Sequence, residues 1–329
     1  MRVRKHGLLQ VVHPQTLTDA KLTDMLREGL PKMAWDTLLS TGDLEMVLEI
    51  PGAGRYRLAV VRHRYGFSLT ARVIDQKVRS LEESGMPASC RKLIQWAQGL
   101  VLVVGPAGCG KTSTLATLVE MINQERAEHI ITIENPIEFV FTPNKSQISQ
   151  RQVGVHSLTQ DAALRAALRE DPDIIVVGEL RDLRTCQLAV SAAETGHLVF
   201  ATMNTNDASQ TLTSLINSFP PDEQSIIRNM VAESLRGVVC QQLIPRLDGQ
   251  GMVCAYEVLM NTTAVAAMVK SGRSKQLNNV IATGKGEGMV LLDDSLKGLV
   301  DQRIISLQEA QARAISPLTF AHQAGAAHG

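Results

Sequence analysis

The sequence predicts an α/β protein whose main domain has a mostly parallel sheet covered by helices on both faces. From residue 99 onward, short apolar runs alternate with helical stretches, as is typical of such a sheet. A glycine-rich segment, Gly105 to Thr112, directly follows the first of these runs and directly precedes a helical stretch. The strands that we expect in this domain cover residues 100–104, 129–133, 173–177 and 197–203.

The segment from 105 to 112 has the pattern G-x-x-x-x-G-K-T, which is typical of a phosphate-binding loop between a strand and a helix. Its glycines let the backbone curl so that successive N–H groups point at phosphate oxygens, and the helix adds the positive end of its dipole. We expect Lys111 to reach the β- and γ-phosphates and the Thr112 hydroxyl to hold Mg²⁺. The residues expected to contact ATP are Gly105, Pro106, Ala107, Gly108, Cys109, Gly110, Lys111, Thr112 and Ser113.

The first 75 residues predict a small α/β domain. Three short strands, 44–50, 55–61 and 67–73, are separated by Pro51-Gly52-Ala53-Gly54 and by a turn near Gly66. Helices are expected over 18–27 and 33–39, before these strands. A linker and a lead-in helix, residues 76–98, connect this domain to the nucleotide-binding core, residues 99–258.

The region after the core is expected to be helical over 259–315. The helices predicted there cover residues 262–270, 275–282, 289–301 and 306–314. The tail, 316–329, has no periodicity and is predicted to be disordered.

The composition excludes several classes of function. Lys plus Arg and Asp plus Glu both number 33, so no global basic field favours nucleic acid as a partner. Aromatic residues make up 3%, too few for a platform on which bases could stack. The longest apolar runs are far shorter than the roughly 20 residues of a membrane span, and no secretory signal is visible, so we expect a cytoplasmic protein without an integral membrane segment. Five cysteines without a C-x-x-C pair argue against a disulfide framework or a zinc site.

Acidic residues follow two of the predicted core strands. Glu179 ends the stretch 173–179, which we expect to be a buried strand that ends in a carboxylate. Ligand groups in open α/β sheets cluster at the carboxyl ends of strands. Glu179 is therefore expected beside Lys111 and the metal. Glu134 and Glu138 follow the strand 129–133, and either could orient or deprotonate the water that attacks the γ-phosphate.

Several motifs in order resemble the secretion ATPase superfamily, most closely its PilT-type pilus-retraction motors. The resemblance covers nearly the whole chain and is densest over 99–245. Besides the phosphate-binding loop, its motifs are Thr132 to Glu138, Gln150 to Gly154, Ala167 to Asp173, Val177 to Asp182 and Ala192 to Phe200.

The resemblance implies a RecA-like P-loop NTPase core, a PAS-like N-terminal domain and C-terminal helices. It also implies a ring of six subunits with ATP between neighbours, an inner-membrane platform protein as partner and a place at the cytoplasmic base of a pilus machine. A paralogous retraction ATPase is a further candidate partner.

The same resemblance assigns roles to individual residues. It makes Glu138 the catalytic base and Glu179 the Walker B glutamate, which contacts Mg²⁺ through water. The two histidines of the family's histidine box correspond to His197 and Asn204, which we expect to contact the nucleotide. Arginines from the N-terminal domain reach the phosphates in this family, and the candidates here are Arg55, Arg57 and Arg72, with Arg62 and Arg64 close by.

The chain departs from the family pattern at four places. Asn135 stands where the family has Asp, and Asn204 stands where it has the histidine that senses the γ-phosphate; Asn can still donate a hydrogen bond but cannot be cationic. In the segment 264–270, alanines replace the Arg and Asn of the family's retraction motif. Val3 to Val12 is either an incomplete domain edge or the result of a misplaced start.

These features leave more than one function open. The first is an active hexameric ATPase that powers pilus retraction, twitching motility or related filament dynamics. The second is a weakly active accessory subunit that binds nucleotide and acts through a fully active motor. An extension or type II secretion ATPase is a third, although the four-cysteine zinc insertion typical of that group is missing, and a nucleic-acid motor is the last.

Overall fold

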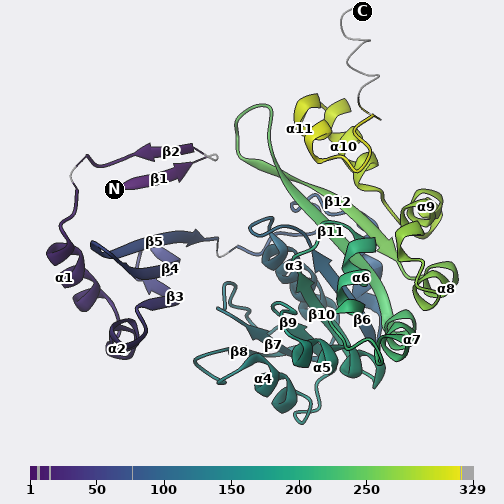
Figure 1. The fold of residues 1–329 in the computed structure, drawn as a ribbon, viewed down its shortest axis with the longest axis horizontal. Helices are drawn as coiled ribbons and strands as arrows, with labels where there is room; N and C mark the ends of the chain where they lie inside the picture. Colours follow the sequence, from purple (N-terminus) through teal and green to yellow (C-terminus); the bar gives the residue numbers. More distant parts are fainter. Residues whose placement is uncertain (6–7, 15, 76, 319, 321–329) are drawn as a thin grey trace, which may run out of the picture. The chain divides into compact units, whose positions relative to one another are not determined.

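The computed structural model describes residues 1–5, 8–14, 16–75, 77–318 and 320. The chain divides into two compact units (Figure 1). The smaller one contains Met1–Lys77 and, from much later in the sequence, Pro136–Val140. The larger one contains Val78–Asn135 and Phe141–Gly329. The segment 136–140, which the sequence placed in the core, therefore groups with the N-terminal region.

The smaller unit has a three-stranded antiparallel sheet in the order β3-β4-β5 and a separate hairpin of β1 and β2. Leu58 and Val60, on β4, are buried on the face of the sheet that packs against Leu26, Leu30 and Leu38 from the two helices and their connection. The three strands and two helices predicted here are confirmed. The elements are β1 (Arg2–Lys5), β2 (Leu8–Val11), α1 (Asp19–Gly29), α2 (Lys32–Thr41), β3 (Asp43–Ile50), β4 (Gly54–His63) and β5 (Gly66–Ile74).

The larger unit contains a seven-stranded sheet in the order β12-β11-β6-β10-β9-β7-β8. All neighbouring strands pair in parallel except β11 and β12, so the predicted mostly parallel sheet is confirmed. Its strands are β6 (Gly99–Val104), β7 (His129–Glu134), β8 (Gln147–Gln152), β9 (Ile174–Val177), β10 (Leu198–Met203), β11 (Leu235–Pro245) and β12 (Met252–Met260). Its helices up to β11 are η1 (Ala88–Gln95), α3 (Lys111–Glu125), α4 (Gln160–Ala167), α5 (Leu183–Glu194), α6 (Ala208–Asn217) and α7 (Gln224–Ser234).

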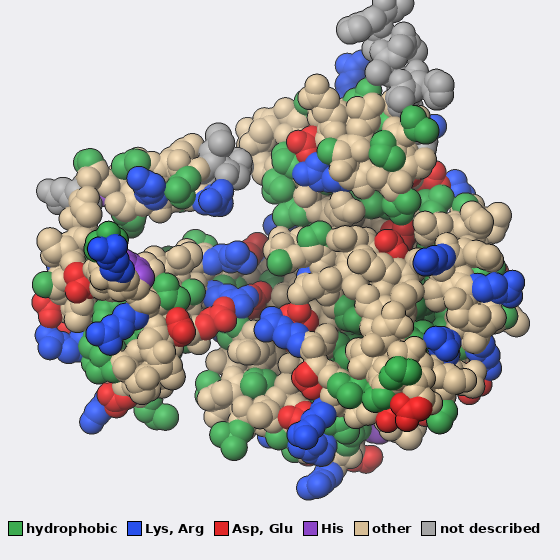
Figure 2. Space-filling model, in the orientation of Figure 1, with side chains coloured by type: hydrophobic (Ala, Val, Ile, Leu, Met, Phe, Trp, Pro, Cys, Tyr) green, Lys and Arg blue, Asp and Glu red, His purple; other side chains and the backbone are tan. Residues whose placement is uncertain are grey.

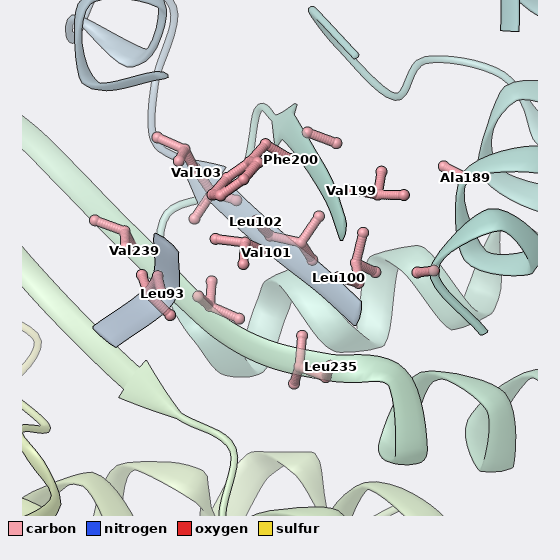
Figure 3. Close-up of a cluster of buried hydrophobic side chains, with 14 of the residues drawn as sticks. Leu93, Leu100, Val101, Leu102, Val103, Ala189, Val199, Phe200, Leu235 and Val239 are labelled. Atoms are coloured by element: carbon pink, nitrogen blue, oxygen red, sulfur yellow. The ribbon is translucent and has the colours of Figure 1, made fainter. Parts of the chain in front are cut away.

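The central strands are buried on both faces. Every residue of β6 and β10 is buried, and Phe200 packs among the aliphatic side chains of β6 and β11 (Figure 3). A strand enclosed in this way reads as a continuous apolar run, and for this reason 100–104 could be recognised from the sequence. The core thus fixes β6 rigidly just before the glycine-rich loop.

The antiparallel pair of β11 and β12 was not predicted (Figure 1). The sequence was expected to become helical after Glu257, but β12 continues to Met260. Beyond it, the four predicted C-terminal helices are observed with shorter bounds, as α8 (Thr263–Lys270), α9 (Leu277–Thr283), α10 (Leu292–Asp301) and α11 (Leu307–Arg313), together with the short helices η2 (Ser274–Gln276) and η3 (Gly284–Glu287).

A second hydrophobic cluster joins the C-terminal helices to the hairpin. It contains Ile244 and Ala255 from β11 and β12, Leu292 and Leu296 from α10, and Phe320. Most of the tail predicted to be disordered, residues 319 and 321–329, lies outside the described residues. Phe320 itself is buried, so the hydrophobic packing extends into this tail.

The surface gives no sign of charge segregation on the face shown in Figure 2, where Lys and Arg side chains are interspersed with Asp and Glu. None of the helices in the described part of the chain has the length and apolar character that a bilayer crossing requires.

Candidate functional site

The glycine-rich loop leaves the carboxyl end of β6 and leads into α3. Gly105, Gly108 and Gly110 all have positive φ, and a Cβ at Gly105 would lie 2.3 Å from the carbonyl oxygen of Gln241. Only glycine fits this close approach without moving the backbone of β11. The sequence therefore builds the curled loop that phosphate binding needs, held against the neighbouring strand.

Lys111, the first residue of α3, points back across the loop. Its Nζ donates to the carbonyl oxygens of Gly105 at 2.7 Å and Pro106 at 3.0 Å, and to Oδ1 of Asn204 at 2.7 Å. Asn204 directly follows β10, the strand beside β6. The ammonium group is thus already held at the mouth of the loop by three oxygen acceptors.

Asn204 also contacts the glutamate that follows β9. Its Nδ2 donates to Oε1 of Glu179, whose other oxygen pairs with Arg181 at 2.6 Å. Gln160, at the start of α4, donates to the backbone oxygen of Glu179 at 2.6 Å. The structure therefore brings Lys111, Asn204 and Glu179 into one hydrogen-bonded chain at the carboxyl ends of three adjacent strands.

Gln241, on β11, supports the loop from the sheet. Its Nε2 donates to the carbonyl oxygen of Cys109 at 2.7 Å, and its side chain is 1% exposed. The pKa of the Cys109 thiol is raised by burial, against the opposing effect of the Lys111 charge, so this side chain packs as a neutral group. Sequence reasoning missed Gln241 because no local pattern indicates that β11 passes beneath the loop.

The loop and the neighbouring strand ends contain oxygen groups that could act as ligands of a magnesium ion. The hydroxyl groups of Thr112 and Ser113 lie in the exposed first turn of α3, and Glu179 is half-buried beyond the carboxyl end of β9. No group of three metal-ligating His, Cys, Asp or Glu side chains exists among the described residues. Mg²⁺ in nucleotide sites takes one or two protein ligands, and phosphate oxygens and water complete its shell, so the residues fit this ion.

The two acidic residues that follow β7 have different surroundings. Oε1 of Glu134 accepts from the Thr132 hydroxyl at 2.6 Å and from Nε2 of Gln150 at 3.0 Å, within the larger unit. Glu138 groups with the smaller unit, where its Oε1 accepts from Arg57 at 2.9 Å. Both carboxylates are held in fixed orientations by these partners.

Arg55, Arg57 and Arg72 lie on one face of the smaller unit's sheet. Arg57 also pairs with Glu45 at 2.5 Å, and Arg72 stands opposite Arg57 in the register of β4 and β5. Arg55 donates to the backbone oxygens of Ile137, at 2.9 Å, and Glu138. Arg55 and Arg57 thus bind the segment that carries Glu138. Their contact with the phosphates of a nucleotide between subunits stays a prediction.

His197 lies away from the loop. It directly precedes β10, and Asn204 directly follows this strand of 6 residues. Since β10 runs parallel to β6, His197 stands at the amino-end edge of the sheet, about 20 Å from the loop at roughly 3.3 Å per residue. Its Nδ1 lies 3.1 Å from the Ala192 carbonyl oxygen. The structure does not bring His197 to the other predicted nucleotide contacts, and strand direction is the physical reason.

Comparisons with known proteins agree with this geometry. Residues 2–316 match the model of the type II/IV secretion system protein family. The chain is 41% identical to the type IV pilus retraction ATPase PilT of Pseudomonas aeruginosa, over 97% of this chain and 90% of the relative. It is 37% identical to a twitching motility protein of Neisseria gonorrhoeae, over 95% of this chain and 83% of that one.

Among solved structures, the pilus retraction motor PilT with bound ADP matches with a TM-score of 0.86 and 33% identity, covering 97% of this chain and 91% of that chain. The predicted fold class and the predicted resemblance to this family are thereby confirmed. The chain has a glycine-rich loop of the phosphate-binding type between β6 and α3, and it shares its fold with these proteins over nearly its full length. It therefore belongs to the type II/IV secretion system protein family.

Proposed function

We propose that this chain binds ATP with Mg²⁺ at residues 105–112 and hydrolyses it as a subunit of a motor that drives pilus retraction or related filament dynamics. The observation that carries the proposal is the chain of hydrogen bonds from Lys111 through Asn204 to Glu179 beside the loop. Lys111 begins α3, and Asn204 and Glu179 follow β10 and β9; we propose that these three side chains surround the γ-phosphate. The names of the relatives, retraction ATPase and twitching motility protein, support the assignment to pili.

Each residue of the site has a distinct part in the proposed reaction. The backbone N–H groups of the loop and the Lys111 ammonium group bind the phosphates. Thr112 and Glu179 would hold Mg²⁺, the latter through water, and the ion would supply positive charge beside the phosphate oxygens. Asn204 uses its Nδ2 to donate a hydrogen bond toward the γ-phosphate when Lys111 moves from Oδ1 to the nucleotide.

Glu138 is the proposed base, and Glu134 is the alternative. In this structure Oε1 of Glu138 accepts a hydrogen bond from Arg57, so this oxygen becomes free to contact a water molecule when the ion pair opens. Arg57 would be released at the same moment and could then contact a phosphate. We therefore propose that opening of this pair is the step at which base and arginine become available together.

The proposal also includes the assembly and the location of the protein. Six subunits form a ring with ATP between neighbours, and the ring attaches to an inner-membrane platform protein at the cytoplasmic base of the pilus. A paralogous retraction ATPase is a further candidate partner. Arg57 and Arg72, which share one sheet face, are the residues proposed to act on a neighbouring subunit's nucleotide.

A weakly active accessory subunit is the second candidate function. Asn204 favours it, because a neutral amide replaces the histidine that other family members use as the γ-phosphate sensor. A purified accessory subunit would bind nucleotide but turn it over slowly, and its rate would depend on a partner motor.

Steady-state ATP hydrolysis by the purified protein tests the proposal. Lys111→Ala should reduce turnover to background, because it removes the cation that contacts the phosphates, and the far-UV CD spectrum should stay unchanged. Lys285→Ala is the matched control, since it removes a lysine whose surface ion pair with Asp294 lies far along the chain from the loop. If Lys111→Ala keeps more than about a tenth of the wild-type kcat, the proposed site is wrong.

A further inference from the structure

Glu257, on β12, is a buried carboxyl group outside the proposed reaction. Its side chain is 1% exposed, and its pKa is raised, mainly by burial and in part by the Asp207 carboxylate. Oε1 accepts from the backbone N–H of Ala208 at 2.9 Å and from the Cys240 thiol at 3.5 Å. Oε2 is buried and makes no hydrogen bond with the described residues. Burying such a group without full pairing is costly, and an apolar side chain would avoid that cost.

Ala208 is the first residue of α6, and its N–H is one of the donors that a helix leaves unpaired at its N-terminus. The Leu292 amide, at the start of α10, also lowers the pKa of Glu257. The carboxyl group therefore lies near the N-termini of two helices, whose dipoles stabilise its ionised form.

The helix that Glu257 binds is tied closely to Asn204. Asp207 caps α6 by accepting from the Gln210 N–H at 2.7 Å. The Thr205 hydroxyl lies 2.6 Å from that of Thr211, one turn into the helix. Only three residues separate Asn204 from Ala208, so a displacement of the first turn of α6 would displace Asn204 as well.

We infer that Glu257 is a positioning residue for the γ-phosphate contact: it anchors the start of α6 to β12 and thereby holds Asn204 between Lys111 and Glu179. The inference rests on the proposed function of Asn204. An error of about 1 Å in the position of such a group can cost about 10²-fold in rate, so a buried anchor at this point matters for turnover.

Substitutions at Glu257 separate this role from general stabilisation of the fold. Glu257→Leu nearly keeps the volume of the side chain and removes the acceptor, so kcat should fall at least tenfold while the Kd for ADP changes less than tenfold. Glu257→Gln keeps an oxygen for the Ala208 N–H and should retain kcat within threefold. Cys240→Ala removes the other donor to the same oxygen and should leave kcat near that of the wild type.

A double-mutant cycle provides the decisive readout. If Glu257 acts through Asn204, Glu257→Leu should lower kcat less than twofold in an Asn204→Ala background. Equal losses in both backgrounds would overturn the inference, and so would a tenfold or larger weakening of ADP binding. Should the leucine variant not fold, Glu257→Asp replaces it in the cycle, since its shorter side chain withdraws the acceptor from α6. Lys111→Ala distinguishes the two failures, because full activity of that variant would refute the proposed site itself.

Discussion

Replacing Asn204 with alanine tests how much the hydrogen-bonded chain beside the loop contributes to turnover. The substitution removes two contacts, one from Lys111 to Oδ1 at 2.7 Å and one from Nδ2 to Glu179. Lys111 keeps its contacts with the carbonyl oxygens of Gly105 and Pro106, so its position is largely preserved. We therefore expect the Kd for ADP to change less than about tenfold, which corresponds to about 1.4 kcal/mol.

Turnover should respond much more strongly than binding. Loss of one preorganised donor to the transition state typically costs about 10²- to 10³-fold in kcat, equivalent to roughly 2.7–4 kcal/mol. The assay is steady-state hydrolysis of ATP beside equilibrium binding of ADP, both at saturating Mg²⁺. A fall in kcat of less than about threefold would refute the idea that Asn204 contacts the transition state.

Substitution by histidine at the same position distinguishes the two candidate functions. If Asn204 is a working sensor, Asn204→His should change kcat by less than about tenfold, or 1.4 kcal/mol in the barrier. If the chain is an accessory subunit that has lost hydrolysis with this group, the histidine should raise kcat by about 10² or more. A gain of that size would contradict the active motor.

Three other predictions concern the base, the loop and the buried carboxyl group. Glu138→Gln should lower kcat by about 10²-fold or more while ATP still binds with Mg²⁺, as measured by rate and equilibrium binding; an unaffected rate would make Glu134 the candidate base. Gly105→Ala should abolish ADP binding in calorimetry, because its Cβ would lie 2.3 Å from the Gln241 oxygen; retained affinity would show that the loop can relax. Glu257→Gln should raise the Tm relative to wild type at pH 8 more than at pH 5. The raised pKa of Glu257 means that the folded state holds its proton more tightly, so wild-type stability is lost as pH rises above the ordinary value of 4.5. An equal change in Tm at both pH values would contradict this assignment.

The sequence was most informative where structure is local. The run 100–104 is buried on both faces, so it appears in the sequence as an uninterrupted apolar stretch. The glycines after it, in the pattern G-x-x-x-x-G-K-T, predict a phosphate-binding loop. In the smaller unit, the three strands could be predicted because turn residues at 51–54 and near Gly66 separate them. Along β4, Leu58 and Val60 are buried on one face, and Arg55 and Arg57 lie on the other.

Contacts between distant segments could not be read in this way. Gln241 meets Cys109 across 132 positions, and its own surroundings in the sequence give no sign of a strand beneath the loop. β11 also contains Arg236, Gly237 and a register shift against β6, which break the apolar pattern. The position of His197, by contrast, could have been predicted from the direction of the strand. His197 precedes β10 and Asn204 follows it, so the two side chains lie at opposite edges of the sheet although both belong to one motif.

The five residues from Pro136 to Val140 make the smaller unit discontinuous in the sequence, so one cut in the chain cannot separate the two units. They follow β7 in the larger unit, yet they supply acceptors for Arg55 and Arg57 in the smaller one. A fragment that ends at Lys77 would leave both arginines without these acceptors, and the remaining chain would carry a loop without its donors. An exchange of N-terminal domains between relatives would therefore have to transfer two separate stretches of the gene together, the first encoding 1–77 and the second encoding 136–140.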